Sequence, residues 1–268
     1  EMHAIQTSGN CIRSITADHF AGAAADEEID PRPYAEILRQ WSSVHPEFSW
    51  LPRKFKIAVN GAREDRAAIR VHDIGLRVVR GDDGAVGFTV FVGGGLGRSP
   101  FLAWKLRDFL PEKDLLAYVE AILRVYNLYG RRDNKYKARI KILMHEAGFE
   151  SVRGDVEGEF ERIRGGALEL PAGDVARLAA RFALPDLAPR PAVSAAETRA
   201  AASDAGFARF LATNVTPHRL PGYASLTISL KPIGGVPGDA TAEQMERVAD
   251  LADRWGHGEI RVSHRQNL

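Results

Sequence analysis

The chain has 268 residues, of which 45% are hydrophobic and 26% charged, with a formal net charge of +1. This length allows two modest domains or one large domain, and the composition is ordinary for a globular protein. A charge so close to zero argues against a general electrostatic preference for nucleic acid or membrane. We therefore expect neither as a partner, and any anion site must be local.

The single cysteine, Cys11, excludes an intramolecular disulfide framework. No Cys/His pattern for zinc and no HExxH motif occurs, so we expect no metal site built from protein side chains. No apolar run reaches the roughly 20 residues of a membrane span, and the start does not resemble a signal peptide. These features predict a cytoplasmic location.

Residues 1–25 are expected to form a loop rich in Gly, Ser, Thr and Asn that leads into a helix. The stretch 30–44 predicts that helix, because prolines stand near its start and apolar residues recur at helical spacing, at Tyr34, Ile37, Leu38 and Trp41. Alternation of apolar residues with lysine and alanine predicts a half-buried strand over 54–62.

Residues 68–97 predict two strands, a hairpin turn at "GDDG", and a third strand that ends in glycines. The stretch 114–130 is a strongly amphipathic helix, with Asp114 near its start and Gly130 as its C-terminal stop.

The composition shifts to Ala, Pro, Arg and Asp over 161–215, which we interpret as a linker or arm with a short helix near its end. The following segment, 216–268, predicts strand, turn, helix and strand. Thr241 and Gln244 form a capping box, and 258–264 is an alternating strand. This β-α-β order indicates half of a split, ferredoxin-like unit.

A cationic run, "RRDNKYKARIKILMHEAG" at 131–148, packs six positive charges into its first eleven residues. If the run is extended, Lys137, Arg139 and Lys141 project to one side, and a helix follows. Such a row suits a compact dianion through charge-assisted hydrogen bonds. The alternative is an exposed basic stretch without a ligand.

The glycine-rich stretch 92–100 follows a predicted strand but breaks the GxGxxG pattern at Arg98, and no Walker motif is present. Its backbone N–H groups could approach a bulky anionic ligand, or it could be a tight turn without one. In "TSGNCIRSIT", an isolated arginine such as Arg13 usually forms a surface ion pair, and Cys11 is expected to be a packed thiol.

Four stretches taken in order resemble the ferredoxin-type sulfite and nitrite reductases, a family with sirohaem and a [4Fe–4S] cluster. They are "QTSGNCIRSITADHFAG", "FVGGGLGRSPFLAWKLRDFLP", "EAILRVYNLYGRRDNKYKARIKILMHEAG" and "LPGYASLTISLKPIGG…GEIRVSHRQNL". The resemblance implies an α+β fold: a sirohaem-type α/β sandwich domain over 1–160, a linker or arm over 161–215, and a partial ferredoxin-like β-α-β unit over 216–268.

The resemblance also implies site residues. Arg13 corresponds to an arginine that faces the distal side of sirohaem, and Arg139 and Lys141 correspond to the basic pair that completes the substrate pocket. Lys137 extends the same row. Segments that surround the macrocycle or its carboxylates correspond to Asn10, Gly93, Gly94, Gly95, Gly97, Gln266 and Asn267.

The activity implied for the intact parent is six-electron reduction of sulfite to sulfide, or of nitrite to ammonia, with ferredoxin or a flavoprotein as electron donor. The family holds its cluster with cysteines spaced CxxxxxC and CxxxC, whereas this chain has only Cys11, in another motif. We therefore expect a central fragment that is inactive alone, with the cluster segment beyond Leu268. The rival interpretations are a non-enzymatic anion- or RNA-binding module using 131–141, and a cofactor-free scaffold.

Overall fold

The computed structural model describes residues 8–268, which form two compact units. The first contains residues 8–22 and Glu27–Leu184, and the second contains Ala23–Asp26 and Pro185–Leu268. The first unit therefore continues past residue 160, where the sequence placed the end of the first domain.

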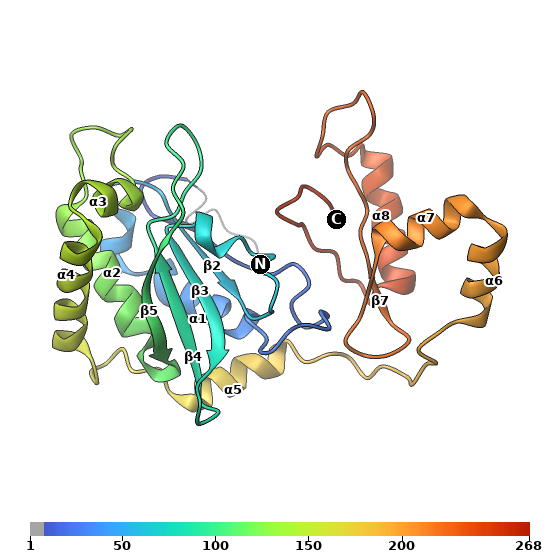
Figure 1. Ribbon diagram of the computed structural model, residues 1–268, viewed down its shortest axis with the longest axis horizontal. Coiled ribbons are helices and arrows are strands. Elements are labelled where there is room, and N and C mark those ends of the chain that lie inside the picture. Colours follow the sequence, from blue (N-terminus) through green and yellow to red (C-terminus); the bar gives the residue numbers. More distant parts are fainter. Residues whose placement is uncertain (1–7) are drawn as a thin grey trace. The chain divides into compact units, whose positions relative to one another are not determined.

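The first unit is built on a five-stranded mixed sheet in the order β1-β2-β3-β4-β5 (Figure 1). The first three strands are parallel, whereas β4 and β5 each run antiparallel to the preceding strand. The strands are β1 (Ile12–Ala17), β2 (Phe55–Asn60), β3 (Ile74–Arg80), β4 (Val86–Val92) and β5 (Trp104–Pro111).

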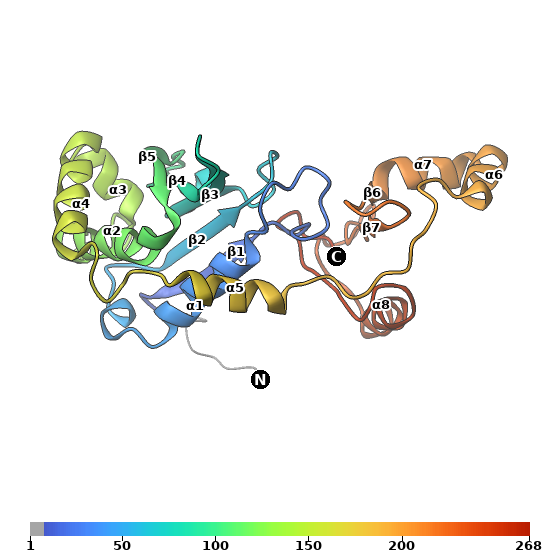
Figure 2. The ribbon, with the colours of Figure 1, turned by 90° about the horizontal axis from the view of Figure 1, so that it is seen from below.

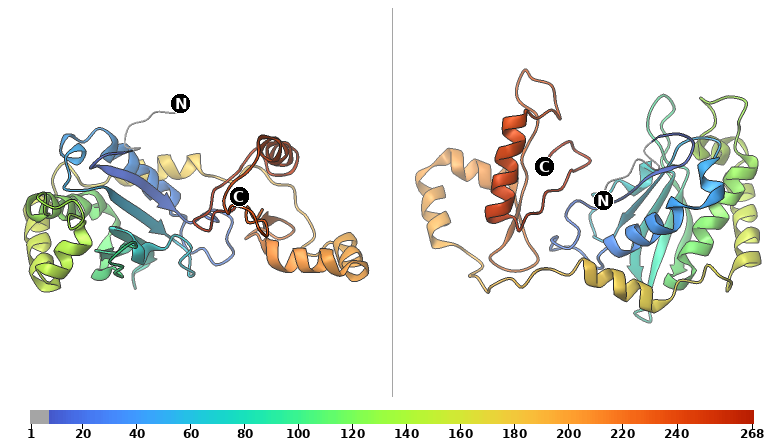
Figure 3. Two further views of the ribbon diagram at one scale, coloured as in Figure 1. Left: turned by 90° about the horizontal axis from the view of Figure 1, so that it is seen from above. Right: turned by 180° about the vertical axis from the view of Figure 1, so that it is seen from behind.

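Two helices, α1 (Arg32–Ser43) and α2 (Leu115–Tyr129), cover one face of this sheet, as the view from behind shows (Figure 3, right). Every second strand residue points into the core between the layers, because side chains alternate along a strand. Tyr34 of α1 meets Phe88 of β4 edge to face, with ring centroids 5.1 Å apart. A second aromatic contact, between Phe55 of β2 and Tyr126 of α2 with ring centroids 5.4 Å apart, holds α2 against the same face.

Three more helices complete the first unit: α3 (Ile140–Glu146), α4 (Phe149–Ile163) and α5 (Ala172–Arg181) (Figure 2). The α4 helix packs on α2, where the rings of Phe160 and Tyr118 meet edge to face at 5.0 Å. The α5 helix packs against α1 through the buried Leu178.

The helices expected at 30–44 and 114–130 are confirmed. Gly130 ends α2 because its backbone is extended, although its N–H still donates to the carbonyl of Tyr126. Two expectations for the first unit are wrong. The loop at 1–25 contains strand β1 among its described residues, and the first strand expected within 68–97 is a 3₁₀ turn over Ile69–Val71. Residues 1–7 lie outside the described part of the chain.

The strand β2 is more deeply buried than its alternation indicated. Ala58 should face solvent, yet it is fully buried, because Ala67 and Ile69 cover the other face of the sheet. The alternation of residues within a strand cannot reveal that a later loop packs over its second face.

The second unit contains the helices α6 (Ala195–Ser203), α7 (Ala205–Asn214) and α8 (Ala242–Trp255), and the short antiparallel pair β6 (Val215–Pro217) and β7 (Ala224–Leu226). The capping box at α8 is confirmed: Gln244 donates its N–H to the Thr241 hydroxyl at 3.2 Å, and Thr241 donates its N–H to the Gln244 side chain at 2.9 Å. Helix α7 confirms the short helix at the end of the predicted arm.

The strand expected at 258–264 is wrong for this structure. Ile260 and Val262, which the alternation would bury, are exposed, and within the described residues no strand borders this segment. The backbone hydrogen bonds of this segment belong to turns, such as that from the Ser263 N–H to the Asn267 carbonyl at 2.9 Å, and Ile228 and Leu268 exchange hydrogen bonds of 2.8 and 3.1 Å just beyond it. A segment with alternating residues forms a strand only when a neighbouring strand supplies backbone hydrogen bonds. The ferredoxin-like unit is therefore partial.

Candidate functional site

One end of the sheet gathers most of the predicted site residues of the first unit. Arg13 lies at the start of β1, Asp73 immediately precedes β3, and Gly93 immediately follows β4. Helix α3 begins at the same end, with Arg139 just before its first residue (Figure 1). Because β1 to β3 are parallel and β4 is antiparallel, the starts of β1 to β3 and the end of β4 lie at the same end of the sheet. This brings together segments that are far apart in the sequence.

Arg139 is fixed by a buried carboxylate. It has an extended backbone at the start of α3, and its Nε and Nη2 donate to the two carboxylate oxygens of Asp73 at 2.9 and 2.8 Å. Asp73 is 0% exposed and accepts a third hydrogen bond from the backbone N–H of Lys56 at 2.8 Å. The two hydrogen bonds between Arg139 and Asp73 have the bidentate geometry that suits a guanidinium and a carboxylate best.

Burial raises the pKa of the Asp73 carboxyl to about 6, although Arg139 and the Lys56 N–H act in the opposite direction. The unfolded carboxyl has an ordinary pKa of about 3.9. Between these values the folded chain binds more protons than the unfolded chain, so this group makes the free energy of unfolding fall as pH rises from about 4 to 6.

We expect an Asp73→Asn chain to lack this part of the pH dependence. The measurement is urea unfolding of both chains at several pH values. The difference in unfolding free energy, wild type minus variant, should decrease from pH 4 to 6 and level off above. A difference that rises with pH over that window would contradict the assigned direction.

Lys141 is also held in place, with only 7% of its surface exposed. Its Nζ donates to the carbonyl oxygens of Leu96 at 2.9 Å and Ser99 at 2.5 Å, and it lies 6.0 Å from the ring centre of Phe101. Burial lowers the pKa of Lys141, and the nearby Arg139 charge lowers it further. A lysine with a lowered pKa releases its proton more readily.

The extended row of three cations is wrong as a local geometry, because Lys141 lies in the first turn of α3. Arg139 and Lys141 nevertheless lie close together, because the charges of Arg139 and Asp73 both affect the pKa of Lys141. Lys137 is exposed and pairs with Glu146 at 3.9 Å. Since α3 begins at Ile140, period-two spacing ends before Lys141.

The glycines after β4 allow close packing by other parts of the chain. A Cβ atom on Gly93 would lie 2.7 Å from the Met144 side chain, and one on Gly95 would lie 2.9 Å from Cδ of Lys141. The N–H groups of Gly93, Gly94 and Gly95 all donate to backbone carbonyls of the chain. Gly93 and Gly95 therefore leave room for α3 and for the Lys141 side chain, while Gly97 adopts a positive φ of 94°.

Asn10 lies just before β1, and Arg13 lies at the start of that strand. Arg13 is partly exposed, and its Nε donates to the carbonyl of Gly9 at 2.8 Å. The Asn10 side chain is exposed. Cys11 is buried and donates its thiol to the Ser8 carbonyl at 3.2 Å, and burial raises its pKa, as expected for a packed thiol.

Two lysines that the sequence analysis missed belong to this end of the sheet. Burial lowers the pKa of Lys54, and nearby positive charges lower it further, namely those of Arg139, Arg13, Lys56 and Arg53. The register of the sheet places Lys56 beside Ser14, the residue after Arg13. The pattern "KFK" could have revealed both lysines, because Phe55 points into the core and its neighbours point away from it.

Gln266 and Asn267 lie in the second unit. Asn267 accepts a hydrogen bond from Lys231 and donates its N–H to the Ser263 hydroxyl at 3.3 Å. Gln266 is exposed and has a positive φ of 57°.

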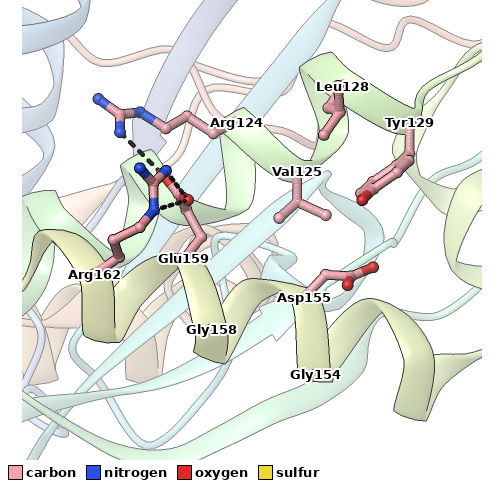
Figure 4. A pocket seen from close by; sticks show the side chains of 9 residues that line it. All are labelled: Arg124, Val125, Leu128, Tyr129, Gly154, Asp155, Gly158, Glu159 and Arg162. Atoms are coloured by element: carbon pink, nitrogen blue, oxygen red, sulfur yellow. Dashed lines mark hydrogen bonds and ion pairs between the residues drawn. The ribbon is translucent and has the colours of Figure 1, made fainter.

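An open groove of about 370 Å³ lies between α2 and α4 (Figure 4). Glu159 in this groove forms ion pairs with Arg124 and Arg162, which leaves the two arginines partly neutralised. The groove contains none of the predicted site residues; its lining is Arg124, Val125, Leu128, Tyr129, Gly154, Asp155, Gly158, Glu159 and Arg162.

Over residues 8–268, no cluster of three or more His, Cys, Asp or Glu side chains has the arrangement of a metal site. Within the same residues, no helix combines the length and apolar character that crossing a bilayer requires.

Comparison with known proteins identifies the class of this chain. The sequence model of the family described as "Nitrite and sulphite reductase 4Fe-4S domain" matches residues 8–163, and that of the "Nitrite/Sulfite reductase ferredoxin-like half domain" matches 223–268. The chain belongs to the nitrite and sulfite reductase family. The family and the α+β fold expected from the sequence are thus confirmed.

Individual relatives agree. A ferredoxin sulfite reductase of Mycolicibacterium paratuberculosis is 34% identical over 58% of this chain and 28% of its own length. An assimilatory ferredoxin-dependent nitrite reductase of Haloferax mediterranei is 30% identical over 97% of this chain and 40% of its own length. The solved structure of Mycobacterium tuberculosis NirA matches with a TM-score of 0.64 and 25% identity, over 93% of this chain and 38% of NirA. The chain thus spans less than half of each relative.

Membership in the family implies sirohaem and a [4Fe–4S] cluster as cofactors of the whole reductase, as the sequence analysis expected. The residues of this chain do not fit the cluster, because a [4Fe–4S] cluster is held by four cysteine thiolates and the chain has one cysteine.

Proposed function

We propose that this chain forms the substrate-binding part of an assimilatory sulfite or nitrite reductase. The reaction is the six-electron reduction of sulfite to sulfide or of nitrite to ammonia, with ferredoxin or a flavoprotein as the electron donor. The observation that carries the proposal is the gathering of cations at one end of the sheet. Arg139, Lys141 and Lys56 lie near the buried Asp73, and Lys54 lies near the charges of Arg139, Arg13 and Lys56.

Each side chain has a role that follows from its surroundings. Arg13 and Arg139 bind the oxyanion, since a guanidinium stays charged and offers several N–H donors. Lys141 donates protons as oxygen leaves as water, which suits an ammonium whose pKa burial lowers. Lys137 has the weakest support as a site residue, because it is exposed and paired with Glu146.

Sirohaem fits this end of the sheet. A polycarboxylate macrocycle needs several cations, and this end of the sheet offers Lys54, whose pKa is lowered first by burial and then by the nearby charges of Arg139, Arg13, Lys56 and Arg53. Lys54 and Lys56 would hold carboxylates of the macrocycle. The bound group supplies the redox chemistry, and the protein supplies binding, orientation and proton donors.

The alternative of an anion- or RNA-binding module using 131–141 loses support from the contacts of that run. Arg131 pairs with Asp133, Arg132 donates to backbone carbonyls, and Arg139 pairs with Asp73. A polyanion would have to compete with these internal partners, and its affinity should fall steeply with salt. The reductase matches give this alternative no support.

The test is an activity assay of the native protein that contains this chain, with its cofactors, using reduced methyl viologen and either sulfite or nitrite. We expect turnover with at least one of the two anions, and loss of that turnover in an Arg13→Gln variant. Wild-type turnover that survives in Arg13→Gln would contradict the proposed site. Protein with full cofactor content that reduces neither anion would contradict the proposed function.

A further inference from the structure

We propose that the open groove between α2 and α4 is a self-association surface, in which the α4 helices of two copies of the chain pack antiparallel across a two-fold axis. The groove lies within the first unit and contains none of the predicted site residues. The inference concerns an interface between copies and does not depend on the proposed reaction.

The α4 side of the groove is open because it is built from glycines. A Cβ atom on Gly154 or on Gly158 would meet no atom within 4 Å. Since these residues are four positions apart, they lie on the same side of α4 and leave a strip of helix backbone without side chains. A second helix can approach such a strip more closely than it can approach a surface covered with side chains.

The α2 side of the groove exposes apolar surface. Leu128 is 72% exposed and Tyr129 is 52% exposed, and both line the groove together with Val125. Neighbouring large apolar side chains that remain exposed are typical of interaction surfaces. Aromatic residues in particular are enriched in protein interfaces. A partner in the groove would therefore cover apolar surface on one side and contact bare backbone on the other.

The charges of the groove are separated along α4. Figure 4 shows Asp155 near Tyr129 at one end and Arg162 with Glu159 at the other. The carboxylate of Asp155 is exposed and has no partner among the described residues. Arg162 exposes 69% of its side chain and its partner Glu159 only 14%, so the surface presents mainly the guanidinium at that end.

This arrangement of charges is complementary to itself after a rotation of 180°. Asp155 lies three residues before Gly158, and Arg162 lies four residues after it. Suppose that the Gly158 residues of two antiparallel α4 helices meet. Asp155 of one copy then differs in height from Arg162 of the other by only about 1.5 Å along the helix axis, the rise of one residue. The two-fold axis repeats this ion pair, and charge complementarity thus selects a second copy of this chain as the partner.

We expect the dimer to be weak and to dissociate on dilution, because one groove per copy is a small interface. Each exposed ion pair contributes little, whereas like charges that face each other across an interface oppose binding strongly. Reversal of one charge in the chain replaces two attractions in the dimer by two repulsions. The dissociation constant of the dimer should therefore rise by at least about tenfold.

Sedimentation equilibrium of the 268-residue chain measures the self-association. The apparent mass of the wild type should rise with protein concentration toward that of a dimer. Asp155→Arg and Arg162→Asp should each weaken dimerisation by at least about tenfold, and the double variant should restore it, because its charges are exchanged and not lost. Asp82→Arg, in the hairpin between β3 and β4, changes an exposed carboxylate outside the groove in the same way and should have no effect.

Gly158→Leu tests the close approach of the helices without a change of charge. Leucine favours a helix, and a Cβ atom there meets no other atom, so the chain should stay folded while the dimer weakens. A wild type that stays monomeric would overturn the inference. Dimerisation that Asp155→Arg and Gly158→Leu leave unchanged, or a double variant no stronger than the single variants, would overturn it as well. Should Arg162→Asp not fold after losing its pair with Glu159, Asp155→Arg and Gly158→Leu decide.

Discussion

A Lys141→Met substitution in the intact reductase should lower turnover with sulfite or nitrite by about 10²–10³-fold, the usual cost of losing one preorganised donor at an oxyanion. Methionine keeps most of the side-chain volume but has neither charge nor proton to give. Lys141 is buried and its pKa is lowered, so no solvent-exposed group can replace it without rearrangement. Steady-state kinetics with reduced methyl viologen measures the effect.

Lys137→Met is the matched control, since it removes the same charge from an exposed side chain four residues earlier. Surface substitutions usually change the free energy of unfolding by no more than about 0.5 kcal/mol. We expect turnover of this variant to stay close to that of the wild type. Equal losses in both variants would show a general electrostatic effect. Lys141→Met also removes the bonds to Leu96 and Ser99, so the unfolding free energy must be measured beside turnover.

The second large effect is expected from Gly94→Ala. A Cβ atom at this position would lie 2.4 Å from the carbonyl oxygen of Arg70 and 2.6 Å from that of His72. Both obstacles are backbone atoms, which cannot rotate away as a side chain can. Overpacking of this kind typically costs about 1–3 kcal/mol, which urea unfolding would measure as a lower midpoint.

Gly154→Ala provides the opposite control. Gly154 lies within α4, and a Cβ atom there would meet no atom within 4 Å. Alanine in a helix interior is more favourable than glycine by about 0.5–1 kcal/mol, so this variant should be slightly stabilised. A Gly94→Ala chain as stable as the wild type would refute the close packing described for the glycine stretch.

The elements that sequence patterns predicted correctly are those whose cause is local. Helices α1 and α2 follow from apolar residues at helical spacing, and the hairpin between β3 and β4 follows from its "GDDG" turn. Strand β1 escaped notice, because its sequence, "IRSITA", is too polar for a typical strand. The strand expected at 258–264 fails for the converse reason, since its pattern needs a neighbour to form a ladder.

The sequence allowed only part of the candidate site to be proposed, for the same reason. The charges of Arg13, Arg139 and Lys141 could be read from the sequence, together with the family resemblance. Their partners could not: Asp73 lies 66 residues before Arg139, and the carbonyl of Leu96 lies 45 residues before Lys141. These contacts depend on the order of the strands, which no local pattern specifies.

The most direct test of the central claim, that this end of the sheet binds the substrate anion, is NMR mapping of sulfite on the side chains of the chain. We predict that the Arg13 and Arg139 Nε–H signals and the Lys141 ammonium signal shift together and saturate with one dissociation constant. Signals of Arg124 and Arg162, in the groove between α2 and α4, should not move. Saturable shifts confined to that groove, or no saturable shift at Arg13, Arg139 and Lys141, would contradict the claim.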